Sequence, residues 1–479
     1  MEFNKKTTAA LLITFLFLSV TAYFYLSSHF ESSDELGFEK EDHNIFFITV
    51  EALNPERIGY HGYERETTPN IDKLAEDSVI FENAYAPSGG TAFSFAKMFS
   101  SQYFHTDNLG EFIPHGQMEF NTNNSLVNIL NREGYTTVGI VPHFNLQEEQ
   151  GFGKEFDIYR DDNPPGVEND SVRDWFFEEN YYTFPEYEPL QKYFNSQRKT
   201  AEELTDEAIK EVDQTNLDDE NLFMWLHYFE PHNPYMPPEK EYIDLFDTAK
   251  EEYKEKDIGV YRAYNTAYNL TKYDKTRLKN LYDAEIRYTD EKIGDLIDYL
   301  KESNRYSDST IILTSDHGQC LGEHNIIGHG TLLDCSLKVP LLIKLPDNKY
   351  RRIQEPVSLV DLMPTVFDIT NTTSEQETRG QSLFKNEEER RDYMFFEMSE
   401  DYYRIIGDDF DKFNINMWHE VEKFAKSVDS DYNTEKADEA IEIIREKKIE
   451  PLTELEDSNE FSEEEKERVE RAQKELGYD

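Results

Sequence analysis

Three short apolar segments constrain the fold of this chain most strongly. They are Asn44–Val50 (NIFFITV), Asn221–His227 (NLFMWLH) and Ser309–Ser315 (STIILTS). Continuous apolar runs of this length are typical of central strands that are covered on both faces. Segments with helical periodicity lie between them, above all Thr271–Ser303, whose leucines and isoleucines recur at helical spacing. This alternation predicts an α/β fold, an α/β/α sandwich around a mostly parallel central sheet.

The chain has 479 residues, enough for one large α/β domain with smaller additions. We expect the main domain to occupy residues 43–385, with an irregular, acidic and aromatic insertion at 148–198. Residues 386–479 are more charged and predict an acidic C-terminal subdomain that ends in a solvated helix. The first 42 residues divide into an apolar segment at 1–30 and a polar linker at 31–42.

The charge of the chain is strongly negative, with 99 Asp and Glu against 49 Lys and Arg and a formal net charge of −50. Such a field repels nucleic acids, so we expect no DNA or RNA partner. Aromatic residues make up 14% of the chain, which excludes a disordered acidic polymer. The composition is instead typical of an acidic surface suited to high salt, where a Debye length near ~3 Å at 1 M screens the repulsion.

An uncharged apolar run at Thr8–Ser27 has about the ~20 residues that a membrane-spanning helix needs. Lys5 and Lys6 precede this run and acidic residues follow it, so the positive-inside rule predicts a cytoplasmic N-terminus. We therefore expect a single-pass anchor in the cell membrane with the body of the protein outside; a cleaved signal peptide is the alternative. The two cysteines, Cys320 and Cys335, do not form the pattern of a disulfide framework and leave the redox compartment undecided.

Residues with metal-binding or acid–base chemistry follow the three apolar strands. Glu51 comes directly after the first, Asp316 and His317 follow the third, and His227 and His232 lie at and beyond the end of the second. The carboxyl ends of parallel strands are where open α/β sheets gather ligands. A carboxylate and an imidazole side by side, as in Asp316–His317, suit a metal ion. A solvated loop glutamate, a strand-end cap and structural histidines are the alternatives.

Thr91 is predicted to lie at the N-terminus of a helix. The turn-forming segment Pro87–Thr91 precedes Ala92–Phe99, whose residues favour helix. Backbone N–H groups and the helix dipole at such a position stabilise a phosphate or sulfate oxyanion. A simple N-cap role for Thr91 is the alternative, and it is compatible with a role as nucleophile.

Several ordered motifs together resemble one family. They are ITVEALNPERIGYHGY with TTPNIDKLAEDSVIFENAYAPS, then LHYFEPHNPY, TSDHGQCLGEHNIIGHG, KVPLLIK, and VSLVDLMPTVFDI followed by RGQSLF. Between Asn44 and about Phe384 the chain looks like a sulfatase-type member of the alkaline phosphatase superfamily, which implies an alkaline-phosphatase-like α/β/α sandwich. The C-terminal KELGY resembles the tails of archaeal-type members.

The sequence departs from the sulfatase pattern at the nucleophile and at the first metal ligand. Sulfatases carry C-x-P-x-R or S-x-P-x-R, whose Cys or Ser becomes formylglycine, whereas this chain has Thr91-Ala92-Phe93-Ser94-Phe95. A threonine cannot become formylglycine. Glu51 stands where sulfatases generally have Asp. The segment TAFSFAKMFS and the set of Glu51, Thr91 and the Asp-His pair are similar to phosphoethanolamine transferases and lipoteichoic acid synthases.

This resemblance implies a metal-dependent hydrolase or transferase that acts on phosphate or sulfate esters, including lipid- or glycan-linked ones. The implied metal set is Glu51, Thr91, Asp316 and His317, with Zn²⁺ or Mn²⁺ favoured by ligand type and Ca²⁺ or Mg²⁺ possible. Thr91 attacks the ester and forms a covalent intermediate, which water or an alcohol resolves. The residues expected to hold the transferred group or to protonate the leaving oxygen are His232 and His329, with His227 and Lys97 as further candidates. A true sulfatase and a non-catalytic binding protein are the alternatives.

Overall fold

A computed structural model of the chain describes the central part of the sequence. The described residues are 44–103, 110–113, 117–161, 183–184, 199–215, 221–233, 235, 237–246, 258–259, 272–346, 348–373, 378–385, 393–399, 402–407 and 412–416. Apart from Phe384 and Lys385, all of them belong to one compact unit formed by residues 40–383 and 391–479.

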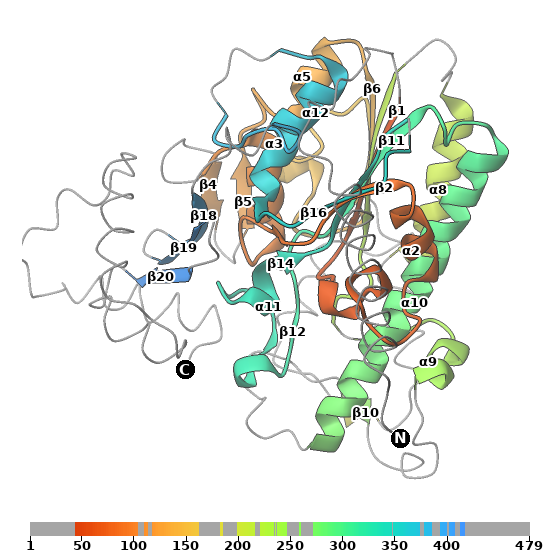
Figure 1. The fold of residues 1–479 in the computed structure, drawn as a ribbon. Helices are drawn as coiled ribbons and strands as arrows, with labels where there is room; N and C mark the ends of the chain where they lie inside the picture. Colours follow the sequence, from red (N-terminus) through yellow and green to blue (C-terminus); the bar gives the residue numbers. More distant parts are fainter. Residues whose placement is uncertain are drawn as a thin grey trace, which may run out of the picture. The chain divides into compact units, whose positions relative to one another are not determined.

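An eight-stranded sheet forms the centre of this unit (Figure 1), in the order β16-β2-β15-β11-β1-β9-β6-β7. Its strands are β16 (Arg351–Ile353), β2 (Ser78–Phe81), β15 (Leu341–Lys344), β11 (Ser309–Thr314), β1 (Asn44–Val50), β9 (Leu222–Tyr228), β6 (Thr136–Ile140) and β7 (Ile158–Arg160). The five strands from β11 to β7 are mutually parallel, and β15 is antiparallel to both of its neighbours. The predicted mostly parallel sheet is confirmed.

The register of the central strands brings their carboxyl ends to one edge. Thr49 of β1 pairs with Thr314 of β11 on one side and with His227 of β9 on the other. All residues of these three strands are buried, as their continuous apolar sequences predict. Any side chain that follows β1, β9 or β11 by one or two residues therefore lies within reach of the other two strand ends.

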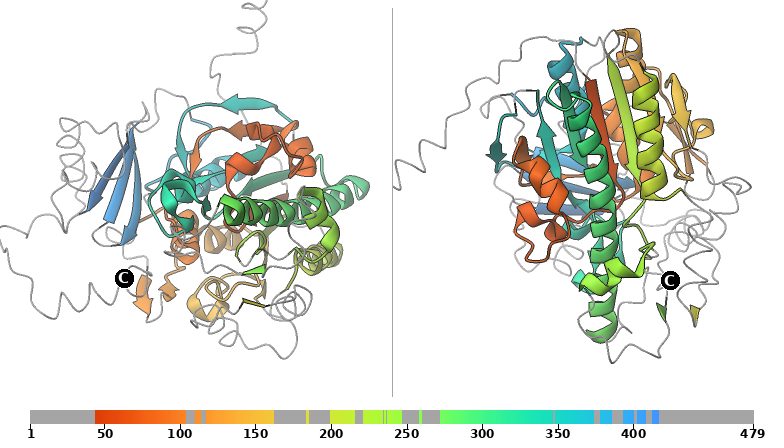
Figure 2. Two further views of the ribbon diagram at one scale, coloured as in Figure 1. Left: turned by 90° about the horizontal axis from the view of Figure 1, so that it is seen from below. Right: turned by 90° about the vertical axis from the view of Figure 1, so that its right-hand side faces the viewer.

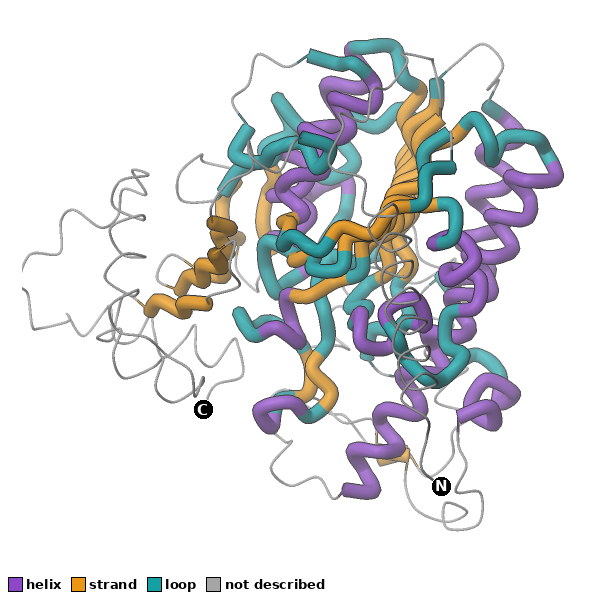
Figure 3. The backbone as a smooth tube through the Cα atoms, in the orientation of Figure 1, coloured by secondary structure: helices purple, strands orange, loops and turns teal. Residues whose placement is uncertain are grey.

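Helices cover the sheet on both faces, which completes the predicted sandwich (Figures 1 and 3). One face carries α2 (Pro69–Ala75), α8 (Ala201–Gln214) and α10 (Lys272–Glu302), and the other carries α3 (Thr91–Ser100), α5 (Leu126–Arg132) and α12 (Leu362–Thr370). A capping box between Thr200 and Glu203 fixes the start of α8. The apolar side of α10 packs into the main core with Leu281, Ile293 and Leu300.

Shorter elements extend this framework. They are the strands β3 (Ala84–Tyr85), β4 (Gly110–Ile113), β5 (Gln117–Phe120), β8 (Thr183–Phe184), β10 (Ile258–Gly259), β12 (Cys320–Leu321), β13 (Ile327–Gly328), β14 (Lys338–Val339) and β17 (Val357–Ser358), and the helices α9 (Lys240–Phe246) and α11 (Asp334–Leu337). Single turns of 3-10 helix occupy Pro55–Arg57, Gly59–His61, Glu148–Gln150, Glu323–Asn325 and Leu359–Asp361. The C-terminal region forms a separate antiparallel sheet of β18 (Tyr393–Ser399), β19 (Tyr402–Gly407) and β20 (Lys412–Asn416), seen in blue in Figure 2.

Three local features differ from the sequence expectations. The apolar motif KVPLLIK is typical of one continuous strand, but it divides into β14 and β15 at Pro340, whose backbone has no N–H to donate. Part of the insertion expected to be irregular is ordered, because Ile158–Arg160 pairs with β6 as the edge strand β7. Cys320 and Cys335 form a disulfide that the sequence did not predict.

The expected anchor at 8–27, the polar linker and the terminal helix lie outside the described residues. Within the described part of the chain, no helix combines the length and the apolar composition that crossing a bilayer requires.

Candidate metal centre

Glu51 lies at the centre of the candidate site. It follows β1 directly and its side chain is fully buried. Its Oε1 accepts a hydrogen bond from Thr91 Oγ1 at 2.8 Å, and its Oε2 lies 2.6 Å from His227 Nε2. Burial alone raises the pKa of this carboxyl, but the neighbouring His143, His227 and His317 outweigh it and hold the pKa well below its ordinary value. Glu51 is therefore a carboxylate.

Asp316 and His317 follow β11 and face Glu51 from the neighbouring strand. The backbone N–H of Ala52 donates to Asp316 Oδ1 at 3.0 Å, and Ala52 adopts a left-handed φ of 53°, which is uncommon for a residue with a side chain. Asp316 Oδ2 is buried and accepts no hydrogen bond. His317 Nδ1 lies 3.0 Å from the carbonyl of Gly318, so Nδ1 carries the hydrogen and Nε2 is directed at the site.

The charges of this cluster fit a bound cation. Burial and the negative charge of Glu51 raise the pKa of Asp316 to about 6. Burial lowers the pKa of His317, but Asp316 and Glu51 outweigh it and raise that pKa to about 9. The two buried carboxylates thus favour a positive charge beside them, which a proton on His317 or a cation would supply.

The donor atoms fit the expected metal as well. Ligand atoms of Glu51, Asp316 and His317 all lie within 4.8 Å of one another, and His317 Nε2 is 3.4 Å from Glu51 Oε1 and 3.2 Å from Asp316 Oδ2. The oxygen of Asp316 that accepts no hydrogen bond is directed into this group. Two carboxylates and one imidazole form a borderline-hard ligand set that divalent metals accept.

Thr91 is the first residue of α3, as predicted, but it is not the N-cap. Gly90 occupies the cap position, and the Thr91 hydroxyl contacts the metal cluster instead. Its Oγ1 lies 2.8 Å from Glu51 Oε1 and 3.3 Å from His317 Nε2. Ser94, one turn further along α3, donates to the Asp316 carbonyl at 2.5 Å. This bond connects the helix to the segment that carries Asp316 and His317. The structure thus brings all four predicted metal-site residues together.

His232 and His329 form a second pair beside this cluster. Their Nε2 atoms lie 3.0 Å apart, and the His329 ring stacks on the His317 ring with centroids 4.0 Å apart. Each Nδ1 faces a backbone carbonyl, that of Asn233 at 2.7 Å and that of Gly89 at 3.2 Å. Both Nδ1 atoms are therefore placed to donate to these carbonyls, and the two Nε2 atoms face each other. Burial and the nearby His317 and His232 hold the pKa of His329 well below its ordinary value.

His227 contacts the Glu51 oxygen that does not face Thr91. Its Nε2 faces Glu51 Oε2, and its Nδ1 lies 2.9 Å from the hydroxyl of Thr49, to which Trp225 Nε1 donates at 3.0 Å. These contacts form a buried chain from Trp225 through Thr49 and His227 to the carboxylate. This series of contacts places His227 where it can orient Glu51.

Lys97 is fully buried on α3 but is not adjacent to Thr91. Six residues along an α-helix correspond to roughly 9 Å of axial rise and to a different face. Lys97 and Thr91 therefore lie on different faces of α3, and a direct role for Lys97 stays a prediction.

His143 belongs to the site and was missed by the sequence analysis. It follows β6 and is buried, and its Nε2 lies 3.8 Å from Glu51 Oε2. The backbone N–H of Asn145 donates to its Nδ1 at 3.1 Å, so the Nε2 of neutral His143 carries the hydrogen. Burial lowers its pKa to about 3, which favours the neutral form. The available signal was its position just beyond a strand parallel to β9, at the edge that gathers the other site residues.

Fold and site together define a class: ester hydrolases built on a mostly parallel α/β/α sandwich, with a candidate metal site at the carboxyl edge of the sheet. A family model described as Sulfatase matches residues 43–372. The chain belongs to the sulfatase family, whose members are metal-dependent hydrolases.

Relatives and solved structures agree with this assignment. An arylsulfatase of Clostridium perfringens is 25% identical over 468 residues, with 84% of this chain and 92% of the relative covered. A protein solved in complex with its substrate D-glucosamine-2-N,6-O-disulfate has a TM-score of 0.62 at 17% identity and covers 87% of this chain and 100% of its own. The phosphonate monoester hydrolase of Agrobacterium radiobacter has a TM-score of 0.58 at 17% identity, covering 87% of this chain and 98% of its own. At these identities the two structures share the fold.

Proposed function

We propose that this sulfatase-family hydrolase transfers a phosphoryl-type group from a phosphate ester to Thr91, and that water or an alcohol then resolves the intermediate. The observation that carries the proposal is the position of Thr91 Oγ1, 2.8 Å from Glu51 Oε1 and 3.3 Å from His317 Nε2. A hydroxyl placed there meets a carboxylate that accepts its proton and a ligand set for a cation. A threonine that served only as a helix cap has no need of these contacts.

The residues proposed to hold the metal are Glu51, Asp316 and His317, joined by the Thr91 oxygen. Their chemistry favours Zn²⁺ or Mn²⁺, with Ca²⁺ and Mg²⁺ as alternatives. A divalent ion, when bound, lowers the pKa of a coordinated hydroxyl and neutralises the charge of ester oxygens.

The proton transfers are assigned to residues of this chain. Glu51 Oε1 accepts the hydrogen of the Thr91 hydroxyl as the new bond between Oγ1 and the phosphorus or sulfur atom forms. The bond to the leaving oxygen breaks, and a proton carried between His232 and His329 passes to that oxygen. His143 Nε2–H, held by the Asn145 contact at Nδ1, is a further donor directed toward the carboxylate. In the second step the incoming water or alcohol attacks the phosphorus or sulfur atom and gives its proton to the histidine pair. The bond to Thr91 Oγ1 breaks, and Glu51 Oε1 returns the hydrogen to that oxygen.

A sulfate ester is the second candidate substrate, because the relative from Clostridium perfringens is an arylsulfatase. The departure at Thr91 argues for phosphate, since threonine cannot supply the aldehyde hydrate on which formylglycine sulfatases depend. A lipid- or glycan-linked phosphate ester with transfer to an alcohol is proposed on the similarity of the TAFSFAKMFS segment to transferases.

We also propose that the catalytic body lies outside the cell, tethered by residues 8–27. The lysines before the apolar run support this orientation. The Cys320–Cys335 disulfide supports it independently, because stable disulfides are typical of oxidising compartments. Protease added to intact cells should degrade the body and spare an N-terminal tag; protection of the body would place it inside.

The test of the chemistry is a substrate panel applied to wild type, Thr91→Ser and Thr91→Ala. The panel holds bis(4-nitrophenyl) phosphate, 4-nitrophenyl phosphate, 4-nitrophenyl sulfate and a lipid-linked head-group donor with an acceptor alcohol. We expect turnover of a phosphate ester, partial activity for Thr91→Ser and a loss of about a thousandfold or more for Thr91→Ala. Mass spectrometry of protein quenched during turnover should find the transferred group on the peptide that contains Thr91.

The matched control is the stability and metal content of Thr91→Ala. Because Gly90 and not Thr91 caps α3, the variant should lose only about 1 kcal/mol, the worth of one hydrogen bond, and should stay folded. A folded Thr91→Ala protein with full activity would exclude the covalent mechanism and point to an activated water. Turnover of the sulfate ester alone would move the assignment to the second candidate.

A further inference from the structure

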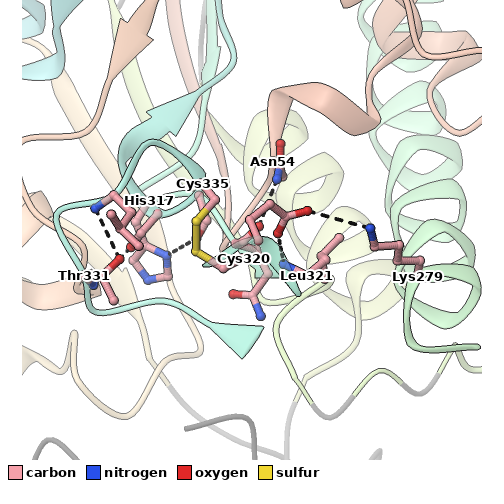
Figure 4. Close-up of a disulfide and its surroundings, with 12 residues drawn as sticks. Asn54, Lys279, His317, Cys320, Leu321, Thr331 and Cys335 are labelled. Atoms are coloured by element: carbon pink, nitrogen blue, oxygen red, sulfur yellow. Dashed lines mark hydrogen bonds and ion pairs between the residues drawn. A yellow bond between two sulfur atoms is a disulfide. The ribbon is translucent and has the colours of Figure 1, made fainter. Parts of the chain in front are cut away.

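The Cys320–Cys335 disulfide has no part in the proposed chemistry, yet it lies at the site. Cys320 belongs to β12, four residues after Asp316, and Cys335 belongs to α11. Figure 4 shows the bridge with His317 and Thr331 close by. The disulfide is thus placed to act on the site through the chain that it closes.

The loop between the two cysteines carries His329. Cys320 and Cys335 are 15 positions apart, and the intervening chain forms the hairpin of β12 and β13 with Cys320 paired to Gly328. His329 follows that pair directly. Its ring stacks on His317 and its Nε2 lies 3.0 Å from His232 Nε2. The disulfide therefore fixes the base of the loop that presents half of the histidine pair.

Backbone hydrogen bonds connect this loop to the segments that carry His317 and Thr91. Gly318, directly after His317, donates its N–H to the Ser336 carbonyl at 2.7 Å, and any side chain at Gly318 would meet the Cys335 carbonyl at 2.5 Å. Gly330 donates to the carbonyl of Gly89 at 2.9 Å, just before the helix of Thr91. A shift of α11 or of the hairpin would move His329 relative to both segments.

Glu51 and Asp316 depend much less on this loop than His317 and His329 do. Glu51 and Asp316 follow β1 and β11, which are central strands of the sheet, and Ala52 binds Asp316 across those two strand ends. Loosening the loop should therefore displace His329 before it disturbs Glu51 or Asp316. This difference separates a positioning effect on the histidine pair from a general loss of structure.

We propose that the Cys320–Cys335 disulfide is a positioning element for His329, so that its reduction lowers turnover while Glu51 and Asp316 stay in place. The inference rests on the proposed function of the histidine pair and adds a redox dependence to it. Cys320 is fully buried and Cys335 is partly exposed, so attack falls on the Cys335 sulfur. A dithiol reductant breaks the S–S bond in a two-electron step. Both cysteines become thiols, and the dithiol is oxidised to its cyclic disulfide.

The experiment compares oxidised wild type, reduced wild type and the double variant Cys320→Ser/Cys335→Ser, all as full chains. Hydrogen exchange is followed by mass spectrometry on peptides covering 321–334 and on peptides containing Glu51 or Asp316. Metal content and the kcat and KM for bis(4-nitrophenyl) phosphate are measured on the same samples. Reduction uses dithiothreitol and, separately, a phosphine, because a thiol reagent can also remove metal.

We expect exchange to rise in 321–334 and to stay unchanged around Glu51 and Asp316. Metal content should stay constant, and kcat should fall by about tenfold or more with a smaller change in KM, because His329 is misplaced. The double variant should behave like reduced wild type and should not respond to either reductant.

Two results would overturn the proposal. One is unchanged exchange in 321–334 on reduction, and the other is a double variant that keeps full kcat although exchange in the loop has risen. If oxidised wild type turns over none of the panel of substrates, the proposed function fails, while the exchange and metal measurements still report whether the disulfide holds the loop.

Discussion

The two carboxylate oxygens of Glu51 contact different partners. Oε1 meets the hydroxyl of Thr91 and the imidazole of His317, whereas Oε2 is held by His227. A glutamate has one more rotatable bond than an aspartate, so it needs an additional contact to keep one oxygen directed at the site. His227, backed by Thr49 and Trp225, supplies that contact. We therefore expect His227 to hold Glu51 in position rather than to contact the substrate.

The support by His227 predicts different outcomes for two substitutions. In His227→Gln the side-chain amide can still donate to Glu51 Oε2, whereas the shorter His227→Asn cannot reach it. We expect His227→Asn to lower metal affinity and kcat by about 10- to 100-fold, with His227→Gln within a few-fold of wild type. Chelator competition gives the metal affinity and steady-state kinetics give kcat and KM. An Asn variant with normal metal affinity and a raised KM would place His227 against the substrate instead.

Asp316 Oδ2 accepts no hydrogen bond, and from this we predict the effect of Asp316→Asn. The variant keeps an oxygen for the Ala52 N–H but removes one of two buried negative charges. Metal bound per chain, measured by elemental analysis after dialysis, should fall sharply. The exposed Asp295→Asn serves as control, because it removes one surface carboxylate from a chain whose net charge of −50 can adsorb cations. Equal metal content in the two variants would remove Asp316 from the site.

One edge of the sheet is the short strand β16, and a side-chain contact attaches it to the end of β2. β16 pairs with β2, and Glu82, just after β2, binds Arg352 of β16 and lies 3.4 Å from His61 Nδ1. Burial raises the pKa of Glu82, but the hydrogen bonds from His61 and Arg352 outweigh it and lower the pKa to about 2. The ionised carboxylate is therefore what holds this edge.

This lowered pKa predicts an acid-dependent contribution to stability. The carboxyl titrates near ~4.3 in the unfolded chain, so its contribution is present in full above that pH and is lost as the pH falls toward 2. Glu82→Gln should lower the free energy of unfolding by on the order of 1 kcal/mol at pH 7, because the group is partly solvated. The difference from wild type should shrink between pH 5 and 3 in denaturant titrations.

The exposed Glu302→Gln is the matched control for this experiment. It carries the same change in net charge and should show no such pH dependence. A Glu82→Gln difference that stays constant from pH 7 to 3 would contradict the assignment of the low pKa to the Arg352 contact.

At the scale of the whole molecule, the excess of 50 negative charges sets the conditions in which the fold is stable. Like charges on a compact surface repel, and salt shortens the range of that repulsion from ~10 Å at 0.1 M to ~3 Å at 1 M. The adaptation to high salt stays a prediction from composition. The resemblance of the C-terminal residues to archaeal-type tails falls outside the described part of the chain.

The charge predicts that the melting temperature rises with KCl. We expect a rise between 0.1 and 2 M KCl that is steepest at low salt, where the Debye length changes most. Thermal unfolding followed by circular dichroism measures it. The same scan with sorbitol, an uncharged osmolyte, separates screening from preferential exclusion. A melting temperature that does not respond to KCl would reject the prediction.

The sequence by itself predicted the layers of the fold and the edge of the sheet where the candidate site residues meet. Continuous apolar strands can be stable only inside a sheet covered on both faces, so β1, β9 and β11 were recognisable from their composition. The strand-end rule then placed Glu51, Asp316 and His317 at one edge, and the glycine-rich turn placed Thr91 at a helix start. These inferences succeeded because each depends on local chemistry and on the regular spacing of strands.

The atoms that face one another follow from the packing of the whole chain. His143 joins the site because β6 lies next to β9 in the sheet, and strand order is not written in local sequence. Cys320 and Cys335 pair because the β12–β13 hairpin returns the chain to α11. His227 supports Glu51 because the register of β1 and β9 sets Thr49 beside it. Contacts of this kind depend on strand order, register and chain reversal, which are settled when the whole core packs and not by any segment alone.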